Sequence, residues 1–182
     1  MLELALHILD IAENSVRAQA KWVSIDINED RLKDLLGIEI ADDGVGMNEE
    51  ALQKALDPFY TSKTVRSVGL GLPMFKEAAE RAGGKFTIRS SQGAGTRVSA
   101  LFQLSHIDRQ PLGDVTGALV TLIVGNASVD FIYRHRCGER VFELDTREIR
   151  QEIGDIPIYH MEIATWIRQQ MREGLIEIGT SA

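Results

Sequence analysis

The sequence predicts an α+β protein, a two-layer α/β sandwich with a small α+β extension at its C-terminal end. Three observations support this fold class. Residues 2–18 place apolar side chains on more than one face of a helix, as expected for a helix that packs against a sheet. Short segments rich in β-branched residues, with apolar and polar positions alternating, follow it. A later helical segment stops at a pair of glycines, Gly83 and Gly84.

The elements of the first part of the chain follow from local signals. The segments WVSIDI and LLGIEIA alternate as strands do, and Asn48 is a plausible N-cap for a short helix. Pro58 lies in a stretch without periodicity, and the glycines of residues 92–95 are typical of a hairpin turn. The predicted elements are a helix at 2–18, strands at 22–27 and 35–41, a short helix from 48 to about 56, a loop at 57–68, a helix at 70–82, and a hairpin of 85–90 and 96–104.

A polar joint at residues 105–113 is the best candidate for a domain boundary, which divides the chain into 1–104 and 105–182. Beyond it, Asp114 can cap a helix through Val124, although the β-branched residues there also suit a strand. His135 is expected near an exposed turn. The other predicted elements are a hairpin of 129–133 and 140–144 and helices at 146–153 and 161–172; the role of this extension is unassigned.

Composition excludes several classes of protein. The chain has 182 residues, a formal net charge of −7, 44% hydrophobic residues and a single cysteine, Cys137. An acidic chain gains no bulk attraction to nucleic acid or anionic lipid, so neither is an expected partner. One cysteine allows no disulfide framework. The N-terminal segment lacks the basic start of a signal peptide, and no apolar stretch is long enough to span a membrane, so a cytoplasmic location is expected.

Two short patterns suggest metal and base recognition. Asp10 and Asn14 are four residues apart, which places them on one face of the first helix. A carboxylate beside an amide oxygen suits a hydrated magnesium ion. Asp42 ends a predicted strand and precedes Gly44 and Gly46, whose small size allows the backbone to approach a flat ligand. A buried carboxylate at this point can accept a hydrogen bond from an exocyclic amine such as that of adenine.

Two further patterns suggest phosphate recognition. Gly69-Leu70-Gly71-Leu72 opens a helix directly after a loop, and free N–H groups at a helix N-terminus bind anions. Lys63 lies just upstream and can reach a terminal phosphate. Taken singly, each pattern also fits ordinary structure: a solvated helix face, an Asp-Gly turn or a loop lysine. Their order and spacing together favour a nucleotide site.

Taken together, these patterns resemble those of the GHKL superfamily, which includes gyrase-type topoisomerases, histidine kinases and MutL-type repair proteins. The resemblance covers about residues 1–104 and implies the Bergerat ATP-binding fold, with ATP and Mg²⁺ as ligands. The matching segments are 10–15 (DIAENS, N box), 42–46 (DDGVG, first glycine box), 57–63 (DPFYTSK, F box of histidine kinases), 69–72 (GLGL, second glycine box) and 93–96 (GAGT, final glycine box).

The resemblance implies a role for each matched position. Asn14 would hold magnesium against the phosphates, with Asp10 as a second candidate ligand. Asp42 would bind the adenine amine, and Thr96 would bond near it. Phe59 would anchor the lid over ATP, and Lys63 would meet the γ-phosphate as a candidate catalytic residue. The implied nucleotide-binding residues are Asn14, Asp42, Gly44, Gly46, Met47, Phe59, Lys63, Gly69, Leu70, Gly71, Leu72 and Thr96.

Three departures from the family pattern bear on activity. Asp10 stands where hydrolytic relatives have a glutamate that activates water, and its side chain is one methylene shorter, which puts hydrolysis in doubt. The chain starts at the N-box helix, where a histidine kinase would first place a helical hairpin with a phospho-accepting histidine. His7 lies within the N-box helix itself and is expected to pack there. The lid at residues 64–68 is short.

The leading functional hypothesis is therefore a Mg-ATP-binding signalling or regulatory module without its own phospho-accepting hairpin. Its nucleotide state, or phosphotransfer, would control a protein partner, and a homodimer is compatible with this role. One alternative is an anti-sigma-type protein Ser/Thr kinase in which Asp10 acts as the base. A MutL-like ATPase is the other.

Overall fold

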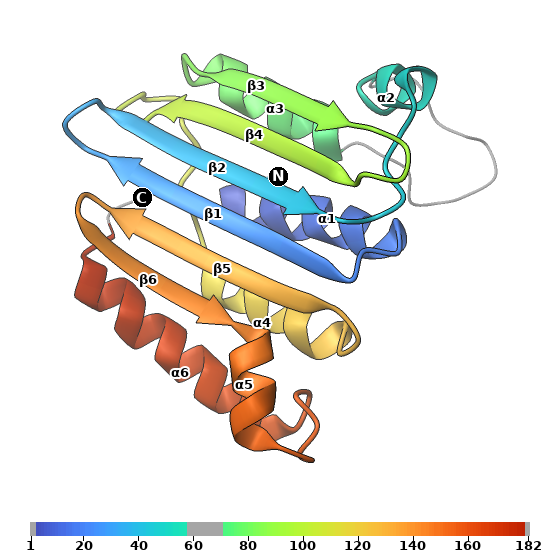
Figure 1. Ribbon diagram of the computed structural model, residues 1–182. Coiled ribbons are helices and arrows are strands. Elements are labelled where there is room, and N and C mark those ends of the chain that lie inside the picture. The colour runs from blue at the N-terminus through green and yellow to red at the C-terminus, as the bar shows by residue number, and fades with distance from the viewer. Residues whose placement is uncertain (1–2, 58–70, 181–182) are drawn as a thin grey trace.

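The structure, a computed structural model, describes residues 3–57 and 71–180. The predicted α+β class is confirmed: within these residues a six-stranded mixed sheet forms one layer and helices pack on one of its faces, leaving the other face open (Figure 1). The elements are α1 (Leu4–Arg17), β1 (Trp22–Asp30), β2 (Leu35–Asp42), α2 (Glu49–Ala55), α3 (Gly71–Arg81), β3 (Lys85–Ser90), β4 (Thr96–Gln103), α4 (Val115–Gly125), β5 (Asp130–Cys137), β6 (Arg140–Asp145), α5 (Thr146–Ile153) and α6 (Met161–Ile178).

The strand order is β3-β4-β2-β1-β5-β6, which places β1 near the middle of the sheet. β1 pairs antiparallel with β2 and parallel with β5, and the remaining pairs are antiparallel. In this register Ile25 lies between Ile40 of β2 and Tyr133 of β5, and all three are buried. Because side chains alternate along a strand, this row faces the helices while its neighbours face solvent.

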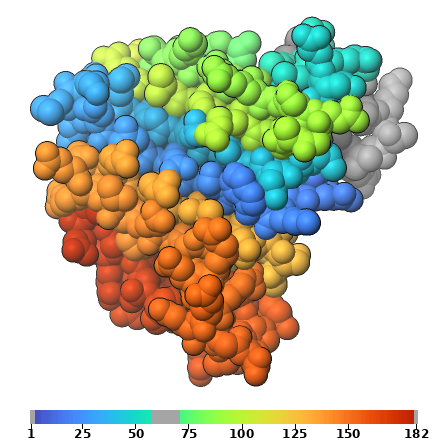
Figure 2. All heavy atoms as spheres, viewed as in Figure 1, coloured from blue at the N-terminus to red at the C-terminus, as the bar shows by residue number. Residues whose placement is uncertain are grey.

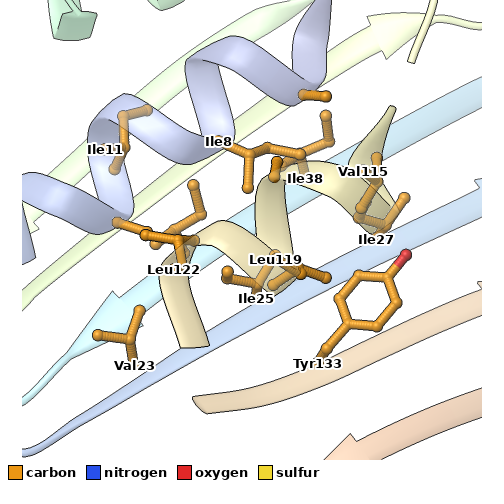
Figure 3. Close-up of a cluster of buried hydrophobic side chains, with 14 of the residues drawn as sticks. Ile8, Ile11, Val23, Ile25, Ile27, Ile38, Val115, Leu119, Leu122 and Tyr133 are labelled. Atoms are coloured by element: carbon orange, nitrogen blue, oxygen red, sulfur yellow. The ribbon is translucent and has the colours of Figure 1, made fainter. Parts of the chain in front are cut away.

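The core joins the two parts of the chain. Ile8 and Ile11 of α1 pack with Leu119 and Leu122 of α4 above the buried row of strand residues (Figure 3). All four of these side chains are at most 3% exposed. Residues on both sides of the joint at 105–113 therefore belong to one hydrophobic cluster. The division of the chain at residue 104 stays a prediction, and a truncation experiment can test it.

The joint itself caps the first helix. Glu3, at the N-cap position of α1, makes no side-chain capping bond. Instead, the backbone N–H of Leu4 donates to the Pro111 carbonyl at 2.9 Å and that of Ala5 to the Leu112 carbonyl at 2.8 Å. These bonds satisfy two of the N–H groups that a helix start leaves without intrahelical partners. The joint is thus attached to the helix that carries the N box.

The segment after Asp114, for which the sequence allowed either a helix or a strand, is a helix. The Asp114 side chain accepts a hydrogen bond from the Gly117 N–H at 2.8 Å, as an N-cap does. The β-branched residues of α4 are tolerated because the helix is buried on most sides, between α1 and α6. Within the described residues, no helix combines the length and the apolar character needed to cross a membrane.

Two expectations for the second part of the chain are wrong. His135 is not in an exposed turn but is 0% exposed within β5, which runs four residues beyond the predicted Tyr133. Its ring nitrogens are both bonded, to Tyr133 Oη at 2.7 Å and to Glu29 Oε1 at 2.9 Å, so a polar residue can be buried there. Helix α6 also continues past the predicted end at Arg172 to Ile178; Gly174, within this extension, packs directly against Phe142 of β6.

Candidate functional site

A cavity of about 350 Å³ lies between the second half of α1, the ends of β2 and β4, and the helices α2 and α3. Its walls are mostly apolar, with a few polar side chains at defined places. This size and character are those of a small-molecule site. The lining residues are Ile11, Asn14, Ser15, Arg17, Ala18, Ile40, Asp42, Gly46, Met47, Ala55, Leu72, Thr96 and Val98.

Asp42 is the acidic group of this cavity and is held from two sides. The residue is 8% exposed. Ser15 Oγ of α1 donates to Asp42 Oδ2 at 2.6 Å, and the Gly44 N–H donates to Asp42 Oδ1 at 2.8 Å. Two oxygens of a carboxylate can accept about four hydrogen bonds, so Asp42 keeps acceptor capacity for a ligand. Its orientation is set before any ligand arrives.

Two glycines allow the backbone around Asp42 to pack closely. Gly46 has φ +65°, and a Cβ there would lie 1.9 Å from the Ser91 carbonyl oxygen. Gly95 has φ +77°, and a Cβ there would lie 1.9 Å from the Asp42 carbonyl oxygen. Any larger residue would force apart the loop after β2 and the β3–β4 turn. Both glycines come from the predicted glycine boxes, which gives those boxes a steric reason.

The wall opposite α1 is joined by hydroxyl groups. Thr96 of β4 lies directly across from Asp42 in the antiparallel register. Its Oγ1 is 2.9 Å from Ser90 Oγ, which also accepts a hydrogen bond from the Met47 N–H at 2.8 Å. Thr96 and Met47 are therefore linked through Ser90, and both line the cavity. The loop after β2 is fixed to the hairpin by side chains as well as by packing.

The N-box residues divide between the cavity and its border. Asn14 lines the cavity and accepts a hydrogen bond from Arg17 Nη1 at 3.0 Å. Arg17 lines it too; its guanidinium is exposed and forms a salt bridge with Glu13 at 3.0 Å. Asp10 is not among the lining residues. Its carboxylate lies against Gly71, where a Cβ would come within 1.8 Å of Asp10 Oδ2. Asp10 thus borders the first turn of α3.

The structure brings together six of the residues that the sequence singled out: Asn14, Asp42, Gly46, Met47, Leu72 and Thr96 line one cavity. The Gly44 N–H donates to the Asp42 carboxylate, and Gly71 is the first residue of α3 and lies beside Asp10. Phe59, Lys63, Gly69 and Leu70 lie outside the described residues. Within the described ranges, no group of three or more His, Cys, Asp or Glu side chains could hold a metal ion.

Sequence reasoning missed several lining residues, of which Ser15 and Arg17 are the polar ones. A signal for them was present. Ile11, Ser15 and Ala18 follow one another at helical spacing, one residue beside Asn14, so they share its side of α1. A serine within a helix whose neighbours face the core also needs an acceptor, and Asp42 supplies it. The apolar wall residues carried no chemical signal.

The chain is similar to several bacterial proteins over about half of its length or slightly more, two of them sensor proteins. The Non-motile and phage-resistance protein of Caulobacter vibrioides is 28% identical over 120 residues, which are 61% of this chain and 14% of that protein. The sensor histidine kinase WalK of Bacillus subtilis is 34% identical over 92 residues, covering 48% and 14%. For the sensor protein DegM of Bacillus sp. the values are 32% over 91 residues, 50% and 24%. The chain therefore spans only a small part of these relatives.

Solved structures share the fold at low sequence identity. The N-terminal domain of a DNA repair protein superposes with a TM-score of 0.54 and 17% identity, covering 80% of this chain and 52% of that one. The MutL ATPase domain of Aquifex aeolicus, complexed with ADP, gives a TM-score of 0.50 and 17% identity, covering 74% and 60%. Each superposition covers a larger share of this chain than residues 2–106 represent. The structural likeness therefore continues into the second part of the chain.

The family described as histidine kinase-, DNA gyrase B-, and HSP90-like ATPase matches residues 2–106, more than half of the chain. Its match covers the N box, the first glycine box and the hairpin turn whose residues surround the cavity. The geometry and the family match thus concern the same residues, and the chain belongs to this family of ATPase domains.

Proposed function

We propose that this protein binds ATP with magnesium in the cavity beside Asp42 and acts as a regulatory module for a protein partner. The observation that carries the proposal is the buried Asp42 carboxylate, which Ser15 and Gly44 orient while it keeps capacity to accept further hydrogen bonds. The family match and the ADP bound to the related MutL domain support a nucleotide as the ligand.

The residues around Asp42 suit a purine base. An exocyclic amine can donate to the free acceptor positions of the carboxylate. Ile40 and Val98 come from neighbouring strands, and Met47 and Leu72 from the segments that border the cavity; all four line it. An apolar enclosure of this kind excludes water, which strengthens the polar bond to Asp42. A flat aromatic base with one amine satisfies both features.

The opposite border suits phosphates and magnesium. Asn14 offers an amide oxygen, and the neighbouring Arg17 offers a guanidinium group. Magnesium in nucleotide sites is held by few protein oxygens together with phosphate oxygens and water. We assign Asn14 as the protein ligand of this ion. On the resemblance of their segments, we assign Gly69, Leu70 and Gly71 to the phosphates, Lys63 to the γ-phosphate and Phe59 to the lid.

The position of Asp10 favours a switch with slow turnover. Its carboxylate is held against Gly71 and does not line the cavity. A general base must come within hydrogen-bond reach of the water it activates, and a shorter side chain makes this harder. We therefore place control of a partner by nucleotide state first. A protein Ser/Thr kinase would label a partner, and a MutL-like ATPase would release phosphate without one. The protein partner, the cytoplasmic location, the absence of nucleic-acid and membrane partners, and a homodimer belong to this proposal.

The test of the nucleotide site is calorimetric titration of Mg-ATP into the wild type and Asp42→Asn. The amide replaces one acceptor oxygen by a donor, which then faces the adenine amine, Ser15 or Gly44. Because a hydrogen bond to a charged group contributes about 1.5–3 kcal/mol, we expect binding to weaken about 10- to 100-fold.

Asp43→Asn is the matched control. Asp43 is exposed, and its Oδ1 accepts from the Lys21 and Trp22 N–H groups at 2.7 and 3.0 Å. This substitution removes the same charge at the next position and keeps an acceptor oxygen, so affinity should stay within about twofold, a difference of under 0.5 kcal/mol. Unchanged Mg-ATP affinity in Asp42→Asn, with both variants folded, would remove the adenine assignment.

A further inference from the structure

β6 forms one edge of the sheet. It pairs with β5 on one side, and no strand lies on its other side within the described sheet. Among residues 71–180, no hydrogen bond joins the backbone of residues 141–144 to an element other than β5. An edge of this kind presents free N–H and C=O groups that can pair with another extended segment.

A small cavity lies where this edge meets α5 and α6. It has a volume of about 140 Å³. Phe142 and Leu144 of β6, Ile149 of α5 and Trp166 of α6 form its apolar lining, and Trp166 is 40% exposed. Sites for small molecules usually measure about 300–1,000 Å³. A cavity of less than half that minimum suits a single side chain rather than a metabolite.

The cavity is preformed by short connections and close packing. β6 ends at Asp145 and α5 begins at Thr146, so no loop separates them. Asp145 caps α5 by accepting from the Arg147 N–H at 2.9 Å. On the other side, Gly174 lets α6 lie directly against Phe142, where a Cβ would come within 2.1 Å of the ring. The surface of α5 projects at the lower end of the molecule (Figure 2).

The charged side chains that line the cavity are all acidic. They are Glu143, Asp145, Glu148 and Glu152; Gln170 is the neutral polar residue of the lining, and no Lys or Arg lines it. Arg134 binds Glu143 at 2.9 Å, and Arg147 binds Asp145 and also attracts Glu148 at longer range, but Glu148 and Glu152 form no salt bridge within the described part of the chain. These two residues are four apart on α5, where like charges repel. A cationic ligand would relieve that repulsion.

We propose that the groove formed by β6, α5 and α6 binds an extended basic segment of a protein partner. The segment pairs with β6 as an added strand and places one apolar side chain in the cavity. Its lysine or arginine residues lie next to Glu148 and Glu152. A second copy of this chain fits poorly, because pairing two β6 edges would bring both acidic rims together. The proposal extends beyond the nucleotide site and does not require ATP binding.

The test uses Trp166 as a reporter. The chain has two tryptophans, so Trp22→Phe leaves Trp166 as the sole one. The probe is an eight-residue peptide of isoleucine, threonine and lysine in which lysines lie two positions from the central isoleucine, so that these side chains share one face of an added strand. We expect it to change Trp166 fluorescence saturably, because Trp166 lines the cavity. A peptide with glutamate in place of lysine should bind at least tenfold more weakly. The same loss is expected when alternate backbone amides are methylated, which removes the N–H donors of the added strand.

Charge reversal on the protein completes the test. The double substitution Glu148→Lys with Glu152→Lys should weaken the lysine peptide at least tenfold, and the corresponding Gln pair should lie between it and the wild type. Glu173→Lys with Glu177→Lys is the matched control, because those exposed residues have the same spacing on α6 and do not line the cavity. The affinity of this control variant for the lysine peptide should stay within twofold of the wild-type value.

Several outcomes would overturn the proposal. One is equal binding by the Glu148/Glu152 and Glu173/Glu177 variants. A second is full binding by the methylated peptide, which would exclude strand addition. The third is a dimer in sedimentation experiments that is lost when Val141 on the β6 edge is replaced by proline, which would make a second copy the occupant. Thermal unfolding of each variant confirms that it is folded.

Discussion

Neighbouring residues of the same type have different roles here because their surroundings differ. Asp42 is buried and faces the cavity, whereas Asp43 is exposed and accepts from two backbone N–H groups at the start of β1. The sequence singles out Asp42 by its position in the first glycine box, but local spacing does not show the burial of either carboxylate. Only the next strand and the helix above decide which carboxylate can reach a ligand.

Asn14 allows a second prediction about the same site. If it is the protein ligand of magnesium, Asn14→Ala should weaken Mg-ATP by about tenfold or more, since even residues that merely orient metal ligands contribute about 10- to 100-fold to metal affinity. Binding of ATP in excess chelator should change little. Titration calorimetry with and without magnesium separates the two effects, and Asn28→Ala on the exposed face of β1 is the control. An equal loss under both conditions would contradict the metal role.

A buried polar chain shows how single residues make the second part of the sheet possible. Tyr133 Oη bonds His135, His135 bonds Glu29, and the Thr180 hydroxyl bonds the same Glu29 oxygen. Burial, with the charge of Glu29 second, raises the pKa of Tyr133 far above its usual value, so the phenol keeps its proton. This series of hydrogen bonds connects β5, β1 and the end of α6, and each buried polar group in it has a partner.

At the scale of elements, α1 connects the functional site to the rest of the protein. Its second half carries Asn14, Ser15 and Arg17, while its first turn is capped by the carbonyls of Pro111 and Leu112. The ring of His7 lies between these ends, bonded to Gln110 at 3.0 Å and packed on Phe75 of α3. Burial lowers the pKa of His7, so it is neutral at neutral pH. A displacement of α1 would therefore change its contacts with the joint at residues 105–113, with α3 and with the cavity.

The close packing of α6 against β6 at Gly174 leads to a prediction at the scale of elements. Gly174→Ala adds a methyl group that would meet the Phe142 ring at 2.1 Å. Overpacking costs about 1–3 kcal/mol, and the better helix propensity of alanine returns about 1 kcal/mol. We expect a net loss of about 1 kcal/mol in the free energy of unfolding, measured by urea denaturation. Gly125→Ala at the end of α4, where nothing lies within 4 Å of the added atom, should be neutral or stabilising. Equal stability of the two variants would show that Phe142 moves aside freely.

At the scale of the whole molecule, the sheet unites the two parts of the chain. β5 runs along almost the full length of β1, from Trp22 paired with Asp130 to Glu29 paired with Cys137. α4 then covers that part of the sheet and packs against α1. The family match ends at residue 106, but the sheet and the core that support the site continue beyond it.

Truncation tests this dependence. A chain ending at residue 106 would expose the edge of β1 and lose the packing of Leu119 and Leu122 on α1 and β1. Because each buried leucine contributes about 1.5–3 kcal/mol and whole domains are stable by about 5–15 kcal/mol, the fragment should lose most of its stability. Circular dichroism should show no cooperative thermal transition. A fragment that unfolds at the temperature of the full chain would instead support independent units divided at residue 104.

Much of the fold followed from local patterns. The alternation in WVSIDI, the glycines after α3 and the cap at Asn48 depend on residues a few positions apart, and the elements they predicted are present. The ends of β5 and α6 did not follow. Arg134 and His135 are accommodated in β5 by Asp26 and Glu29, and Gly174 packs on Phe142 within α6. Those partners are distant in the chain, so no local pattern contains them.

What the sequence by itself determined was therefore the α+β class, the family, and the candidate positions Asn14 and Asp42, because each depends on residue type and short-range spacing. The tertiary structure decided which carboxylate faces the cavity, that Ser15 orients it, and that Asp10 lies against Gly71. It also decided that residues 130–145 complete the sheet and leave an acidic groove at its edge. These features arise from contacts between segments up to about a hundred residues apart, whose pairing is selected by burial of the shared core.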